Sequence, residues 1–208
     1  RFCLEPFGEF IYEWRQIIVF LSIASMYVGA IAAIAQKNLK RLLAYSSIGH
    51  TGYLLIGLAS ANSAGIKGLL IYITIYLLMN VGIFTVILSL KINEQYVEYL
   101  KDLSGMSKKK PLFSLSIAIL MFSLAGIPPF AGFFGKLYIF IAAVESDLIY
   151  LAVLGVIASV ISAYYYLRII KIMYFEDSFL NYQSYLSKKT TLLLFISIIA
   201  VSLFILYP

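Results

Sequence analysis

Long apolar runs separated by short charged segments are the feature that most limits how this chain can fold. Each run is about twenty residues long, the length that an α-helix needs to cross the roughly 30 Å hydrocarbon core of a bilayer. The composition agrees, because 62% of the residues are hydrophobic and only 12% are charged, against about 25% charged in a soluble domain. We therefore predict one all-α, polytopic transmembrane helix bundle. Its six spanning helices are expected over residues 15–36, 40–61, 66–92, 111–145, 147–175 and 189–206.

The fourth of these segments is too long for one straight helix. As a single helix, residues 111–145 would extend about 52 Å, well beyond the hydrocarbon core. The sequence Gly126-Ile127-Pro128-Pro129 interrupts it, and proline both lacks an amide donor and clashes with the preceding turn. We predict two half-helices joined by a non-helical link that contains Gly126, Pro128 and Pro129. At membrane depth such a break is tolerated only where it lines protein or water.

Lys136 follows this break inside the same apolar segment. The next charge towards the C-terminus is Glu145, which puts the ammonium about 13 Å below a membrane surface if the segment is helical. A charge at that depth costs at least about 2.5–3.5 kcal/mol and is a functional-site candidate by default. No acid on the chain is expected at matching depth, so a carboxylate partner would come from another subunit, or the amine is neutral or hydrated. We predict that Lys136 transfers protons; the alternative is a lysine held permanently in a static pair.

The second predicted helix carries a histidine at similar depth. His50 lies about 15 Å along the helix from Lys40, and Ser46 and Ser47 share its face at helical spacing. An imidazole flanked by hydroxyls suits a proton relay, although a neutral histidine bonded between helices is the plainer interpretation. Lys40 lies at the helix start, where it either joins the relay or extends to the headgroups like Arg41.

A polar stripe marks the third predicted helix. Tyr72, Tyr76 and Asn80 recur every fourth residue and so lie on one face, where they hold water, bond across helices, or simply pack. On the fifth helix, the run 164–166 precedes Arg168, a pattern typical of an aromatic belt at the membrane interface with cations that extend to the headgroups.

The positive charges are distributed unevenly between the two membrane sides. Of the 16 Lys and Arg residues, only Arg1, Arg15 and Lys67 fall on the side of the N-terminus. Those on the other side are Lys37, Lys40, Arg41, Lys91, Lys101, Lys108, Lys109, Lys110, Arg168, Lys171, Lys188 and Lys189. This asymmetry places the second side in the cytoplasm or matrix and both termini opposite. The net charge of +6 therefore reflects orientation and is no sign of nucleic-acid binding.

Two longer loops, over residues 93–110 and 176–188, fall on the positive side. In the first, Tyr96, Tyr99, Leu100 and Leu103 are expected to share one face of an amphipathic surface helix.

Little in the sequence suggests chemistry other than proton transfer. The single cysteine, Cys3, excludes an internal disulfide and a cysteine-based metal cluster, and Glu5 and Glu9 give the first segment the wrong charge for a signal or transit peptide. We find no metal-ligand spacing, nucleotide loop or nucleophile–base pair, so redox or hydrolytic chemistry belongs to other chains.

Three segments together resemble one family. Residues 35–50, residues 124–136 around the break, and residues 164–168 are similar, in order and spacing, to the antiporter-like membrane subunits of respiratory complex I (NADH:ubiquinone oxidoreductase), namely subunit 2, or subunit N in bacteria. Within that family, the sequence of these segments looks closest to the mitochondrially encoded members.

The resemblance implies a fold and a set of site residues. In that family, fourteen spanning helices include two inverted repeats with one broken helix each, and this chain looks like the last six. Lys136 matches the lysine of the second broken helix, and Lys40 and His50 match polar positions on the tenth helix. Tyr72, Tyr76 and Asn80 fall where some sister subunits carry two histidines and a lysine, so a proton path here would need tyrosine, asparagine and water.

The family also implies partners and a location. We expect a proton-translocating half-subunit with no cofactor of its own, FMN, iron–sulfur clusters and ubiquinone being held by other subunits. A separate polypeptide is expected to supply the first half, unless the chain is a piece of a longer one, and other membrane-arm subunits and lipids surround it. The expected location is the mitochondrial inner membrane with both termini on the intermembrane-space side, or alternatively a bacterial plasma membrane. Alternative functions are a purely structural half-subunit, or a subunit of a multisubunit sodium/proton antiporter or membrane-bound hydrogenase.

Overall fold

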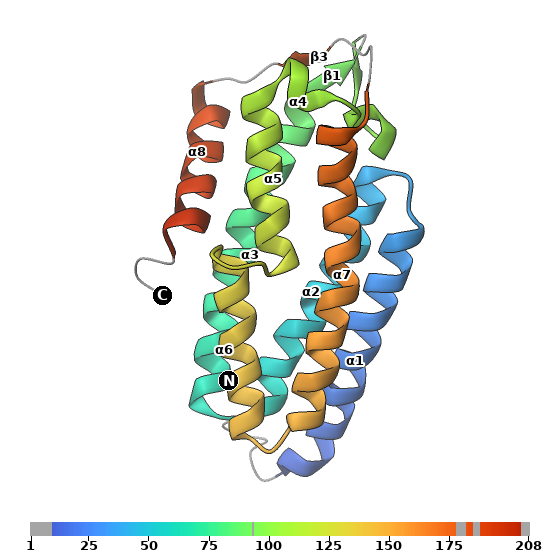
Figure 1. Ribbon diagram of the computed structural model, residues 1–208. Coiled ribbons are helices and arrows are strands. Elements are labelled where there is room, and N and C mark those ends of the chain that lie inside the picture. The colour runs from blue at the N-terminus through green and yellow to red at the C-terminus, as the bar shows by residue number, and fades with distance from the viewer. Residues whose placement is uncertain (1–9, 93, 178–181, 185–187, 205–208) are drawn as a thin grey trace.

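The chain folds into a bundle of long, roughly parallel helices with a small sheet at one end (Figure 1). The structure is a computed structural model, and it describes residues 10–92, 94–177, 182–184 and 188–204. The long helices are α1 (Ile11–Ala35), α2 (Leu39–Ser60), α3 (Ser63–Ser89), α5 (Pro111–Ala125), α6 (Ala131–Glu145), α7 (Ile149–Phe175) and α8 (Lys188–Leu203). The predicted class, a bundle of apolar helices, is confirmed.

The helices differ in whether they are long enough to cross a bilayer. Four of them, α1, α2, α3 and α7, are long and apolar enough to do so by length and composition. The half-helices α5 and α6 have 15 residues each, about 22 Å, so neither spans a hydrocarbon core alone. The predicted count of six spans therefore stays a prediction, in which α5 and α6 together make one span and α8 makes another.

Packing places the two half-helices between α3 and α7. Both α5 and α6 contact α3 and α7, while α1 lies against α2 and α7, and α8 covers α3 (Figure 1). Helices α1 and α2 approach so closely that a Cβ at Gly29 would lie 2.8 Å from the Tyr45 carbonyl oxygen. Small residues allow such backbone contact between membrane helices. The break between α5 and α6 lies about midway along the bundle.

The predicted surface helix over residues 93–110 is wrong. Instead, the segment contributes β2 (Gln95–Tyr96), the 3₁₀ helix η2 (Leu100–Leu103) and the short α4 (Met106–Lys109). Tyr96 and Tyr99 are 53% and 54% exposed, whereas Leu100 and Leu103 are buried, so the four side chains do not share one face.

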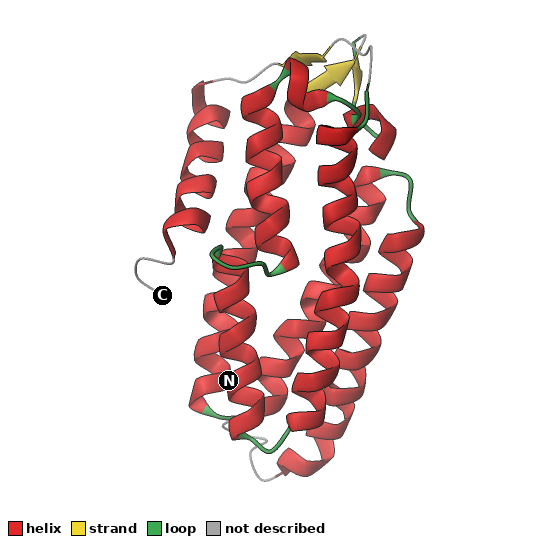
Figure 2. Cartoon of the chain, in the orientation of Figure 1, coloured by secondary structure: helices red, strands yellow, loops and turns green. Residues whose placement is uncertain are grey.

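The reason is pairing with distant segments, which local periodicity does not reveal. The predicted third helix ends early because residues 90–92 form β1 (Leu90–Ile92), which lies between β2 and β3 (Tyr182–Ser184) in an antiparallel sheet. Figure 2 shows these strands gathered at one end of the bundle. In addition, the amide of Leu39 donates to the Glu98 carbonyl at 2.7 Å, and that of Leu100 donates to the Lys37 carbonyl at 2.9 Å.

Some predictions lie outside the described residues. They concern Arg1, Cys3, Glu5, Glu9 and the last residues, 205–206, of the sixth predicted span.

Candidate functional site

The break in the fourth segment is built by a glycine cap. Helix α5 ends at Ala125, and Gly126 adopts a left-handed conformation with φ of 83°. The Gly126 amide donates to the Ser123 carbonyl and the Ile127 amide to the Phe122 carbonyl, at 3.0 and 3.1 Å, the pair of bonds that defines a Schellman cap. Pro128 and Pro129, joined by a cis peptide bond, complete the link. This cap leaves the last two carbonyls of α5, those of Leu124 and Ala125, without intrahelical donors.

Lys136 supplies the missing donors. Its Nζ donates to the Leu124 and Ala125 carbonyls at 3.2 Å each and to Ser159 Oγ at 2.8 Å, while the side chain is only 4% exposed. The three bonds use the three N–H groups of an ammonium. The C-terminal end of a helix carries partial negative charge, so the end of α5 stabilises a cation here. Gly126 leaves the room for this contact, since a Cβ there would lie 3.1 Å from Lys136 Cδ.

The partners of the Lys136 ammonium are neutral groups. Within the described part of the chain they comprise two carbonyls, one hydroxyl and the face of the Tyr53 ring, whose centroid lies 4.9 Å from Nζ. The described ion pairs, Lys40 with Glu98 and Lys108 with Asp177, lie elsewhere. A cleft of about 380 Å³ beside Lys136 is lined by the end of α5, the break, α6 and α7, and its lining residue Val160 is 70% exposed. The lysine is therefore buried yet close to an outer face of the bundle.

His50 stands at the centre of a second hydrogen-bonded group. Its Nδ1 lies 2.6 Å from the Tyr72 hydroxyl and its Nε2 lies 2.8 Å from the Tyr166 hydroxyl. The Tyr166 hydroxyl also forms a short hydrogen bond with Ser46 Oγ. All four side chains are buried. Because a neutral imidazole has one donor and one acceptor nitrogen, one tyrosine donates to His50 while the other accepts, and the group forms a directed chain.

The stripe on α3 contributes unequally to this group. Tyr72 bonds to His50, and Tyr76 stacks on the imidazole with ring centroids 4.6 Å apart. Asn80 instead donates from Nδ2 to the Tyr76 backbone carbonyl at 3.0 Å, which keeps it on its own helix.

Tyr53 lies between the two groups. Its ring faces Lys136 Nζ, and it meets the rings of His50 and Tyr72 edge-on at 6.1 and 6.2 Å. Its hydroxyl is buried and has no hydrogen-bond partner among the described residues. Lys136 and His50 are therefore neighbours across one aromatic ring, and within the described residues no chain of direct hydrogen bonds joins them.

Lys40 is a second predicted site residue, after Asn80, that makes no contact with the His50 group among the described hydrogen bonds. Its side chain is 39% exposed, and its Nζ lies 3.6 Å from the Glu98 carboxylate. This position matches the interpretation of a cation that extends to the headgroups.

The predicted interfacial belt is wrong for two of its three tyrosines. Tyr165 and Tyr166 are buried and Tyr164 is exposed, because α7 turns Tyr165 and Tyr166 into the bundle, where Tyr166 bonds to Ser46 and His50 of α2. Sequence reasoning also missed Tyr53 and Ser159. The signal for Tyr53 was its position one turn beyond His50, and that for Ser159 was its spacing of one helical heptad from Tyr166.

The site contains no evident metal centre. Within the described ranges, no group of three His, Cys, Asp or Glu side chains could hold a metal ion. The side chains that meet here are one amine, one imidazole and several hydroxyls, all of which can bind or pass protons.

Comparison with known proteins gives matches over most of the chain. A family model described as "NADH:quinone oxidoreductase/Mrp antiporter, TM" matches residues 2–162. A relative in Paramagnetospirillum magneticum, named NADH-quinone oxidoreductase subunit N, is 49% identical over all of this chain and 43% of its own length. The chain thus spans less than half the length of this relative.

Two solved structures are also similar. A chain of respiratory complex I from Thermus thermophilus is 32% identical with a TM-score of 0.80, over 92% of this chain and 43% of that one. A chain of the Mrp complex from Dietzia sp. is 28% identical with a TM-score of 0.66, over 80% of this chain and 31% of that one.

Proposed function

The chain belongs to the NADH:quinone oxidoreductase/Mrp antiporter transmembrane family, and we propose that it forms the second half of a proton-translocating subunit in the membrane arm of respiratory complex I. The similarity to a subunit N at 49% identity supports this assignment. NADH-to-quinone electron transfer on other subunits would drive proton transfer through this one. The observation that carries the proposal is the buried Lys136 ammonium, held by two carbonyls and a hydroxyl at the end of α5.

Lys136 is proposed as the proton-binding site. The protonated amine uses all three N–H groups, on the Leu124 and Ala125 carbonyls and on Ser159. After release of one proton, the neutral amine has a free lone pair, which can accept the O–H of Ser159 when that hydroxyl rotates. Ser159 can therefore stay bonded in both states, so the site changes charge without losing this partner.

The His50 group is proposed as the adjoining proton path. If Tyr72 donates to Nδ1, then Nε2 donates to Tyr166, and Tyr166 donates to Ser46. A proton that enters at one nitrogen and leaves from the other reverses every bond in this chain, so repeated transfer needs a reset of the hydroxyls. Water at the unpaired Tyr53 hydroxyl would connect the path to Lys136. Asn80 and Lys40 remain predicted members of the proton path. Their geometry supports this role less, because Asn80 bonds within its own helix and Lys40 is partly exposed beside Glu98.

The architecture and partners are part of the proposal. We infer six spans, with α5 and α6 sharing one, and both termini on the less positive side. The first half of the subunit would come from a separate polypeptide or from the rest of a longer chain, and other membrane-arm subunits would surround it. FMN, iron–sulfur clusters and ubiquinone are assigned to those other subunits. The relatives named above are bacterial, which fits a bacterial plasma membrane and gives the mitochondrial location no support.

Two other functions remain as alternatives. A structural half-subunit would keep Lys136 in a static network, and a sodium/proton antiporter subunit is suggested by the Mrp similarity. The chain is 49% identical to a subunit N and 28% identical to the Mrp chain, and this difference favours complex I.

Substitution of Lys136 tests the proposal. In the assembled complex, Lys136→Met is expected to lower proton pumping per electron or the turnover, because it removes the buried proton-binding amine. Lys108→Met is the matched control, since that lysine is exposed and pairs with Asp177 at the surface. Pumping would be measured in sealed membrane vesicles during NADH oxidation. Equal and negligible effects of the two substitutions would refute the proton-transfer role.

A further inference from the structure

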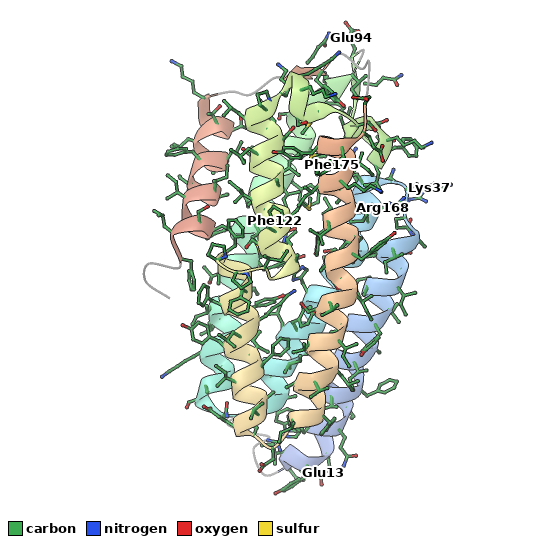
Figure 3. The ribbon with its side chains drawn as sticks, in the orientation of Figure 1. Glu13, Lys37, Glu94, Phe122, Arg168 and Phe175 are labelled. Atoms are coloured by element: carbon green, nitrogen blue, oxygen red, sulfur yellow. The ribbon has the colours of Figure 1, made fainter. Side chains whose placement is uncertain are left out.

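A basic cleft opens at the end of the bundle that carries most of the lysines and arginines, away from Lys136. It has a volume of about 760 Å³ and is lined by four cationic side chains and two tyrosines. The cations are Lys37 of the α1–α2 link, Lys101 of η2, and Arg168 and Lys171 of α7, and the tyrosines are Tyr99 and Tyr164. Figure 3 shows Lys37 and Arg168 on the same side of the bundle, where the α1–α2 link lies beside α7.

The acids of the cleft do not neutralise these cations. The Asp102 carboxylate accepts the backbone amides of Glu98 and Tyr99, at 3.0 and 2.8 Å. The Glu176 carboxylate accepts from Ser104 Oγ at 3.2 Å. The ion pairs found within the described segments involve other lysines. Four cations against two carboxylates leave the cleft with a net positive charge.

The depth of the cleft matches a headgroup layer. From Ile149, at the start of α7, to Arg168 the helix rises about 28 Å, close to the roughly 30 Å thickness of a hydrocarbon core. If Ile149 lies at one boundary of the core, Arg168 lies at the other. Its guanidinium donates one hydrogen bond, from Nη1 to the Ile34 carbonyl at 3.3 Å. The other N–H groups of the guanidinium are left for a ligand.

An apolar surface leads from the membrane into this cleft. Val160 and Tyr164 of α7 are 70% and 58% exposed, and Val153 and Leu167 continue the same helical face. A ligand that covers both features needs an anionic head and an apolar tail.

We propose that the basic cleft binds the phosphate headgroup of an anionic phospholipid, whose acyl chains lie along this exposed face of α7. Arginine and lysine are the side chains that recognise phosphate oxygens, and basic pockets between helices on the cytoplasmic or matrix side are typical of anionic lipid sites. The tyrosines suit the same layer, because aromatic rings concentrate at membrane interfaces. An acidic protein segment would match the charge but not the apolar face below it, so the lipid is favoured.

Photo-crosslinking on the assembled complex tests this assignment. The complex would be reconstituted in phosphatidylcholine nanodiscs that contain a trace of phosphatidylglycerol with a photoreactive group near the headgroup. Labelled peptides are expected to include residues 160–171. The double variant Arg168→Gln/Lys171→Gln should weaken binding roughly thirtyfold, since each cation near the surface contributes about 1 kcal/mol.

The controls separate lipid from other ligands. Lys108→Gln/Lys109→Gln removes the same charge from the same membrane side outside the cleft and should label like the parent. Excess inorganic phosphate should not reduce labelling, and a loss of labelling with it would identify a soluble anion instead. Equal labelling of the parent by phosphatidylcholine and phosphatidylglycerol probes would overturn the proposal, even if the double variant failed to assemble. Absence of labelling in the parent would do the same and would indicate a protein partner over the cleft.

Discussion

Replacing Gly126 by alanine is expected to disable the Lys136 site while the bundle still assembles. Gly126 has φ of 83°, a left-handed conformation that costs a residue with a Cβ about 1–2 kcal/mol. The added Cβ would lie 3.1 Å from Lys136 Cδ and 3.2 Å from Nζ, which is too close for the lysine to stay in place. The flexible lysine can yield by a few tenths of an ångström, so the clash is relieved at the expense of its bonds to the α5 carbonyls.

The expected loss follows from those bonds. A hydrogen bond to a charged group contributes about 1.5–3 kcal/mol. If weakening one such bond raises the barrier to proton transfer by that amount, the pumping rate falls about tenfold to hundredfold.

Gly49→Ala is the matched control for this substitution. Gly49 lies in α2 next to His50, but a Cβ there would meet only the Met26 carbonyl oxygen at 3.9 Å, an ordinary contact. The control is expected to assemble and pump like the parent. The assays are the amount of assembled complex and proton pumping during NADH oxidation in sealed vesicles. If Gly126→Ala assembles normally and pumps at the parental rate, the capping of α5 by Lys136 has no part in proton transfer.

Three further predictions concern single side chains. Tyr53→Phe removes a buried hydroxyl with no described partner, so thermal stability should hold or rise slightly while pumping falls; unchanged pumping would argue against a water link at this position. Lys40→Gln breaks an exposed pair with Glu98 worth about 0–1 kcal/mol, so pumping should change little, and a large loss would return Lys40 to the proton path. The Lys108 ammonium lowers the pKa of the exposed Asp177 carboxyl. This pair therefore stabilises the fold above the usual carboxyl pKa, and the effect disappears as pH falls through the lowered value. Asp177→Asn should accordingly leave stability unchanged in strong acid, as followed by thermal unfolding across pH.

Local sequence signals were sufficient for the break and for the burial of Lys136. Gly126 and the two prolines cannot continue a helix, and that constraint does not depend on the rest of the fold. The position of Lys136 in an apolar segment likewise required burial against polar groups. The sequence did not show which groups these are. Ser159 lies on another helix, and the α5 carbonyls are backbone groups, which every residue has and which therefore leave no signal in a sequence.

Signals that depend on distant partners were misinterpreted. The tyrosine run on α7 has the composition of an interfacial belt, and only packing inside the bundle, where α7 contacts α5, α1 and α2, buries Tyr165 and Tyr166. The loop after α3 has a helical pattern of apolar residues, yet the backbone of Glu98 and Leu100 hydrogen-bonds to Leu39 and Lys37, far away in the sequence. In both cases a neighbour remote in sequence decided the outcome, and the strength of the local pattern was no guide.

The choice of neutral partners for Lys136 bears on how a proton could be exchanged there. Two unit charges 4 Å apart attract with about 4 kcal/mol at an effective dielectric constant of 20, so a buried carboxylate pair would hold the ammonium firmly. The end of a helix stabilises a cation by only about 0.3–2 kcal/mol, and the Ser159 hydroxyl can serve either charge state. Under the proposed function, a site built from the α5 carbonyls and Ser159 would therefore bind a proton without trapping it. A carboxylate brought by a neighbouring subunit to the cleft between α6 and α7 would shift this balance towards the charged form, and its withdrawal would favour release. Because the cleft of about 380 Å³ adjoins Lys136, such a carboxylate would have room to reach the ammonium.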